Sequence, residues 1–134
     1  MKASEYQNLA MRTNNNNATE QLRNLIAPDI DRAIDEGLRN DERIGQILNA
    51  SLGLSGEVGE FNDMLKKWIF HEKPLDEEHL KKELGDICWY IAMMADSFGW
   101  NLDDILQMNV DKLKARYPEG FDTVRANNRS EGDV

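Results

Sequence analysis

The sequence has 134 residues, 40% of them hydrophobic and 31% charged, which fits one compact domain and excludes a disordered chain. Lys and Arg number 16 against 25 Asp and Glu, so the formal net charge is −9. Because phosphate backbones and anionic lipids attract positive charge, this balance argues against a nucleic-acid polymer or a membrane as a partner.

The chain contains a single cysteine, Cys88, so neither a disulfide framework nor a cysteine zinc site can form, and a reducing compartment is indicated. Cys88 lies in an apolar run, where we expect it to be inert packing. No apolar leader follows Met1, and no stretch approaches the ~20 apolar residues of a membrane span. These features predict a cytoplasmic protein.

The first predicted element is a short helix over residues 5–12, with Ser4 as its N-cap. A run of four asparagines ends this helix, because asparagine side chains compete with helical hydrogen bonds. A weaker helical pattern begins at Thr19, is interrupted by Pro28 and closes at Gly37.

A long amphipathic helix is predicted from Ile44 to about Phe70, with Asp41 as its N-cap. Its apolar stripe consists of Ile44, Ile47, Leu54, Val58, Phe61, Leu65 and Ile69. The helix also contains Gly53, Gly56 and Gly59. Each glycine weakens the helix by up to ~1 kcal/mol relative to alanine. The presence of three glycines therefore indicates either close approach by a backbone or a ligand, or simple tolerance.

A turn over residues 71–75 precedes a second long helix, which Asp76 caps and Gly99 terminates. Its apolar stripe consists of Leu80, Leu84, Ile87, Cys88, Ile91, Ala95 and Phe98. Neither histidine, His71 or His79, has a di-iron type spacing, and we expect both on the surface near the turn.

A last helix is predicted over Leu102 to Arg116, with Asn101 as its N-cap. Strand-type alternation and internal repeats are absent from the sequence, which predicts an all-α fold. We expect a single domain over residues 1–121, with its core at about 44–121, and a flexible polar tail over residues 122–134.

Two acidic pairs lie on the two long helices, each with the i, i+3 spacing that places both carboxylates on one side of a helix. The first pair is Glu57 with Glu60, and the second is Glu83 with Asp86. Each pair borders an apolar stripe, so an antiparallel hairpin would bring all four acids to one edge of the core. A single pair is common on solvated helix faces, but two on consecutive helices favour a site.

Four converging carboxylates repel one another, and at neutral pH most would be protonated unless cations neutralised them. Hard oxygen ligands without histidine or cysteine favour Mg²⁺, with Mn²⁺ as a substitute, over zinc or copper. The acids therefore predict a divalent-metal site, and such ions are what a triphosphate substrate needs for charge neutralisation.

Aromatic and polar side chains accompany the acids on the three helices. Trp68 follows the first pair and Tyr90 the second, where ordinary core packing is an equal alternative. On the last helix, Asn109 falls within the apolar stripe and is flanked by Lys112 and Arg116. These three residues either form a structural ion-pair network with the acids or bind phosphate oxygens and orient the metals.

These motifs resemble those of the MazG-like nucleotide pyrophosphohydrolases, within the all-α NTP pyrophosphatase superfamily. The family pattern of ExxE, a spacer and ExxD reads here as GEVGE at Gly56 to Glu60 and KELGD at Lys82 to Asp86. The segment from Asn109 to Pro118 is similar to the NxxKLxxRxP pattern of the family's third helix. The resemblance covers about Leu48 to Phe121.

The resemblance implies a Mg²⁺-dependent pyrophosphohydrolase that cleaves (d)NTP between the α and β phosphates to (d)NMP and pyrophosphate. The implied catalytic and metal-binding residues are Glu57, Glu60, Glu83 and Asp86. A glutamate of the first motif would also serve as the base. The implied substrate-binding residues are Asn109, Lys112, Arg116, Tyr90 and Trp68.

Members of this family build a four-helix bundle from two chains and sometimes pair into tetramers, so the resemblance implies a homodimer or homotetramer. Within the superfamily, a dUTP- or dCTP-specific enzyme or a phosphoribosyl-ATP pyrophosphohydrolase is an alternative with a similar set of carboxylates. From another class, a catalytically silent helical module that binds a metal or a partner fits the same acidic face.

Overall fold

The computed structural model describes residues 1–26 and 43–128, and this part of the chain is all-α, with no strand. Its helices are α1 (Ala3–Met11), α2 (Ala18–Ile26), α4 (Ile44–Phe70), α5 (Glu77–Ser97), α6 (Leu102–Arg116) and α7 (Thr123–Asn127). The predicted all-α class and the three C-terminal helices of the domain are confirmed. The expected interruption at Pro28, the end at Gly37 and the cap at Asp41 lie outside the described residues.

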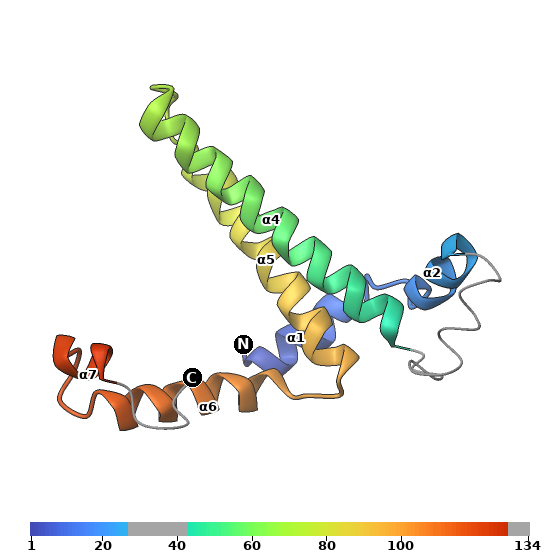
Figure 1. The fold of residues 1–134 in the computed structure, drawn as a ribbon. Coiled ribbons are helices and arrows are strands. Elements are labelled where there is room, and N and C mark those ends of the chain that lie inside the picture. Colours follow the sequence, from blue (N-terminus) through green and yellow to red (C-terminus); the bar gives the residue numbers. More distant parts are fainter. Residues whose placement is uncertain (27–42, 129–134) are drawn as a thin grey trace.

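The long helices α4 and α5 form an antiparallel hairpin, the largest packing unit of the fold (Figure 1). Both ends of α5 follow the predicted local chemistry. The Asp76 side chain accepts a hydrogen bond of 3.0 Å from the His79 N–H. At the other end, Gly99 has φ +67°, the left-handed conformation that favours glycine after a helix.

Small residues allow α4 and α5 to approach closely in the half of the hairpin that lies near α1. Ala50 of α4 and Ala92 of α5 are fully buried. A Cβ atom at Gly53 would lie 2.1 Å from Cε1 of Tyr90, so the tyrosine ring occupies the space that a side chain would need. The close approach expected at a glycine is therefore found at Gly53, where it involves an aromatic side chain.

Helix α1 lies against α5 and the start of α6, and polar contacts of Gln7 fix this arrangement. Its side chain donates to the Trp100 carbonyl and accepts from the Leu102 N–H, both at 3.0 Å. The expected N-cap role of Ser4 is wrong, because α1 begins at Ala3 and the Ser4 hydroxyl donates to the Asp103 carboxylate instead. Tertiary contact with α6 has replaced the local cap.

The chain leaves much of its apolar surface exposed. The buried hydrophobic residues of the described part are few and mostly small: Ala10, Ala50, Ala92, Met93, Ala95 and Leu102. By contrast, Leu52 is 73% exposed, Phe70 75% and Met108 71%. Such a surface is typical of a chain that has a partner, but a dimer stays a prediction at this point.

Several residues of the predicted apolar stripes are exposed rather than buried: Val58, Ile69, Leu84 and Ile91. The expectation that Cys88 is inert packing is also wrong, because its side chain is exposed. The physical reason is geometric: each long helix has one long neighbour, which covers only part of a wide apolar face.

The last described segment contains α7, whose N-cap Asp122 accepts a hydrogen bond of 2.9 Å from the Arg125 N–H. This short helix lies within the predicted tail of residues 122–134, whose flexibility stays a prediction. Among the residues that the structure describes, no helix has the length and apolar character needed to span a membrane.

Candidate active site

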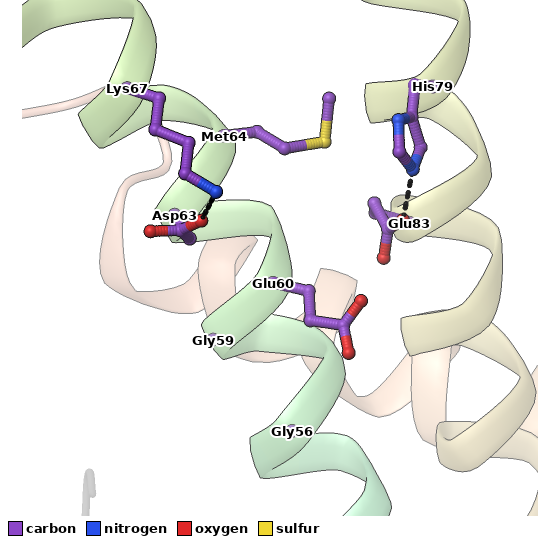
Figure 2. A pocket seen from close by; sticks show the side chains of 8 residues that line it. All are labelled: Gly56, Gly59, Glu60, Asp63, Met64, Lys67, His79 and Glu83. Atoms are coloured by element: carbon purple, nitrogen blue, oxygen red, sulfur yellow. Dashed lines mark ion pairs between the residues drawn. The ribbon is translucent and has the colours of Figure 1, made fainter. Parts of the chain in front are cut away.

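The hairpin brings three of the four predicted acids together. Glu57 and Glu60 lie one turn apart on α4, and Glu83 lies opposite them on α5. One carboxylate oxygen from each residue falls within 4.8 Å of the others. Figure 2 shows Glu60 and Glu83 extending toward each other from the two helices. The i, i+3 spacing and the antiparallel packing together produce this cluster.

The fourth acid, Asp86, is exposed and lies outside the cluster of three. It still influences the cluster, because the pKa of Glu57 is raised first by burial and then by the negative charges of Glu60, Asp86 and Glu83. The carboxylates therefore repel one another electrostatically. Asp86 lies one turn after Glu83 on α5 and adds its negative charge to that of the cluster.

The donor chemistry of the cluster fits a divalent cation. Its ligand atoms are all carboxylate oxygens, the type preferred by Mg²⁺ and Mn²⁺. Besides burial, the negative charges of its neighbours raise the pKa of Glu57, and a bound cation would relieve this repulsion. Glu57, Glu60 and Glu83 are therefore the described residues best placed to hold such an ion.

No role was predicted for His79, which contacts the cluster directly. His79 Nε2 lies 2.8 Å from Glu83 Oε1, and Figure 2 marks this pair with a dashed line. The expectation that both histidines are exposed is confirmed. The missed signal was the i, i+4 spacing between His79 and Glu83, which places the two side chains on the same face of α5.

Two acids of the cluster, Glu60 and Glu83, line one part of a cavity of about 450 Å³ between the two helices, and Glu57 lies beside its lining residues Gly56 and Glu60 on α4. Its lining residues are Gly56, Gly59, Glu60, Asp63, Met64, Lys67, His79 and Glu83. Apart from neighbouring residues of the helix itself, no atom lies within 4 Å of a Cβ built at Gly56 or Gly59, so this wall faces open space. The lining residues reach Lys67 on α4 and His79 on α5, so the cavity extends from the acids toward the ends of the two helices that the turn joins. Figure 2 labels these residues.

A basic residue, Lys67, also lines this cavity and forms an ion pair with Asp63. Lys66 pairs with the same carboxylate at 2.5 Å but does not line the cavity. Hydrogen bonds from Lys66 and Lys67 lower the pKa of Asp63 to about 2. The cavity thus combines carboxylates at one end with a cation farther toward the turn.

The two aromatic residues predicted to contact substrate do not line this cavity. Tyr90 packs against Gly53 and makes an edge contact with Trp89, at a ring-centroid distance of 4.9 Å. Trp68 is 47% exposed on α4. Within one chain, Tyr90 therefore has the contacts of an ordinary packing residue, which was the alternative to a substrate contact.

The predicted polar residues of the last helix also lie away from this cavity. Helix α6 leaves the hairpin at the end remote from the α4–α5 turn and packs on α1 (Figure 1). Asn109 and Lys112 are exposed, and Arg116 is half-buried with its guanidinium carbon 5.9 Å from the Tyr117 ring centroid. No residue of α6 lines the cavity.

Comparison with known proteins agrees with the motifs and the fold. A family model described as the MazG nucleotide pyrophosphohydrolase domain matches residues 47–121, which contain both acidic pairs and the last long helix. The gene 37 protein of Mycobacterium phage L5 is 30% identical over 103 residues, covering 74% of this chain and 90% of that protein. No solved structure matches. The chain belongs to the MazG nucleotide pyrophosphohydrolase family.

Proposed function

We propose that the protein is a Mg²⁺-dependent nucleoside triphosphate pyrophosphohydrolase that releases (d)NMP and pyrophosphate. The observation that carries this proposal is the convergence of Glu57, Glu60 and Glu83 within 4.8 Å beside an open cavity. In a chain of the MazG family, this is the arrangement that can hold a metal against a polyphosphate.

Each acid has a defined role in this proposal. Glu57, Glu60 and Glu83 would hold the metal, and Asp86, whose charge acts on Glu57, would supply a further oxygen ligand. The bound ion would neutralise phosphate charge and polarise the α phosphorus. A glutamate of the first motif accepts the proton of the attacking water, and the bond between the α phosphorus and the bridging oxygen breaks to release pyrophosphate.

The leaving phosphates require positive charge beyond the metal. Lys67 lines the same cavity as Glu60 and Glu83, and its ammonium pairs with Asp63, which lies between Lys67 and Glu60 along α4. We therefore assign Lys67 to the phosphates in the same chain.

A homodimer or homotetramer completes the proposed site. The exposed apolar residues of α6 are Leu106, Met108, Val110 and Leu113. Burying them against a second copy would bring α6 of one chain near the hairpin of another. In that assembly Asn109, Lys112 and Arg116 bind phosphate oxygens from across the interface, and Tyr90 and Trp68 become candidates for contact with the base.

Product analysis tests the reaction. Incubation with each common NTP and dNTP plus Mg²⁺ is expected to yield monophosphate and pyrophosphate. Glu60→Gln is expected to abolish turnover, whereas Glu77→Gln, which removes an exposed acid from the first turn of α5, should leave it unchanged. Diphosphate with phosphate as products, or full activity in Glu60→Gln, would contradict the proposal.

The same panel separates the alternatives. Turnover of dUTP or dCTP alone would indicate a base-specific enzyme. Turnover of phosphoribosyl-ATP alone would indicate a phosphoribosyl-ATP pyrophosphohydrolase. Metal binding without turnover of any of these nucleotides would favour the catalytically silent helical module.

Subunit mixing tests the contribution of α6. Glu60→Gln and Lys112→Gln are each expected to inactivate the protein, because one lacks a metal ligand and the other a phosphate contact. If the two residues act across an interface, mixed assemblies contain one intact site and recover part of the wild-type turnover. Two inactive proteins that form mixed assemblies without recovery would contradict the contribution across the interface.

A further inference from the structure

Glu83 differs from the other acids of the cluster in its burial. It is 7% exposed, and it is the only acidic or basic residue among the buried residues of the described chain. Transferring a carboxylate away from water is costly unless hydrogen bonds replace the lost hydration. The orientation of the Glu83 side chain therefore depends on the donors that it finds in the protein.

His79 supplies such a donor. Its Nε2 lies 2.8 Å from Glu83 Oε1, and because the carboxylate oxygen accepts, the hydrogen lies on Nε2. The backbone of His79 is itself held at the start of α5, where its N–H donates to Asp76 Oδ1 at 3.0 Å. A short sequence of contacts thus runs from the helix cap through the imidazole to the buried carboxylate.

We propose that His79 is a positioning residue, which holds one oxygen of Glu83 so that the carboxylate is presented to Glu57 and Glu60 as a metal ligand. This inference rests on the metal site of the proposed function. Because Nε2–H is a donor in both the neutral imidazole and the imidazolium, the role requires the hydrogen bond and not a positive charge.

The size of the effect follows from the behaviour of hydrogen-bond partners of metal ligands. Removing such a partner lowers metal affinity by about 10–100-fold in general, because the ligand loses its fixed orientation. His79 itself keeps its side chain largely in solvent, at 56% exposure, so its replacement should leave the packing of α5 intact.

The test compares Mn²⁺ binding by calorimetry in the full-length wild-type protein, His79→Leu, His79→Gln and His71→Leu. We expect His79→Leu to weaken binding by about 10–100-fold. His79→Gln should recover most of the affinity, since its amide nitrogen can donate from a similar position. His71→Leu is the matched control, because it replaces an exposed histidine of the turn that does not line the cavity, and it should bind as the wild type does.

A second readout separates positioning from catalysis. At saturating Mn²⁺, His79→Leu should hydrolyse nucleotide at close to the wild-type kcat, with its deficit confined to the metal concentration required. Unchanged or tighter Mn²⁺ binding in His79→Leu, while the wild type binds normally, would overturn this inference alone. Absence of Mn²⁺ binding in the wild type would overturn the proposed function and this inference with it.

Discussion

Two neighbouring stretches of α4 use the same residue type in opposite ways. At Gly53 the helix is pressed against α5, and the Tyr90 ring occupies the space next to the Cα atom. One and two turns later, Gly56 and Gly59 face open space beside the acids. The hairpin is therefore closed near α1 and open toward its turn. This difference shows that glycine in a long helix can serve packing in one half and access in the other.

The largest expected effect concerns the open half. Mg²⁺ or Mn²⁺ should raise the melting temperature, because an ion that binds only the folded state stabilises it by about 2.7 kcal/mol at 100 times its Kd. Thermal unfolding at increasing metal concentration measures this shift. Glu60→Gln should reduce it, and an unchanged melting temperature of the wild type at saturating metal would contradict convergence of the acids on a cation.

Alanine substitution at the glycines tests the comparison directly. Gly53→Ala should destabilise the protein by about 1–3 kcal/mol, because its Cβ would overlap the Tyr90 ring. Gly56→Ala should instead stabilise it by up to about 1 kcal/mol, because alanine favours the helix and meets no neighbour. Denaturant unfolding gives both values.

A second substitution serves as the control for this pair. In a Tyr90→Leu background the overlap is relieved, so Gly53→Ala should lose most of its destabilising effect. Equal effects of Gly53→Ala and Gly56→Ala in the wild-type background would mean that the two halves of the hairpin do not differ.

Two adjacent lysines test whether the open half of the hairpin binds the phosphates of the substrate. Lys66 and Lys67 share Asp63 as a partner, but only Lys67 lines the cavity. Lys67→Gln should raise the KM for nucleotide about tenfold, the loss expected for one hydrogen bond to a charged group. Lys66→Gln should leave KM unchanged, and steady-state kinetics of both variants at saturating Mg²⁺ measures the difference. Similar KM values in the two variants would argue against phosphate binding by Lys67.

The smallest effect concerns acid stability. The lysines lower the pKa of Asp63 from 3.8 to about 2. Its ion pairs therefore stabilise the folded protein at pH values above the pKa of the unfolded state, and this contribution is lost as the pH falls from about 4 to 2. Because Asp63 lies at the surface, the contribution is small. The free energy of unfolding of Asp63→Asn should therefore approach that of the wild type as the pH falls through this range, as followed by circular dichroism.

The local features of the fold were predictable because their signals lie close together in the sequence. The bounds of α4 follow from its apolar stripe, and the caps of α5 and α6 from Asp76 and Asn101. The cluster of Glu57, Glu60 and Glu83 follows from i, i+3 spacing once the two helices are antiparallel.

The features that the sequence did not predict depend on contacts between distant residues. Ser4 was expected to cap its own helix, but its partner is Asp103, 99 residues away. The burial of the apolar stripes was overestimated because periodicity identifies an apolar face without showing how much of it a neighbour covers. Tyr90 has an environment set by Gly53, which only the packing of α4 on α5 brings close.

The cap at Asp76 has a consequence for how the hairpin can vary in length. An α-helix turns by about 100° per residue, so one residue inserted between Asp76 and Glu83 would rotate this carboxylate away from α4. The same insertion in the connection before Asp76, over residues 71–75, leaves the angular phase of α5 unchanged. We therefore expect length changes in this hairpin to be tolerated ahead of the cap but not between the cap and Glu83.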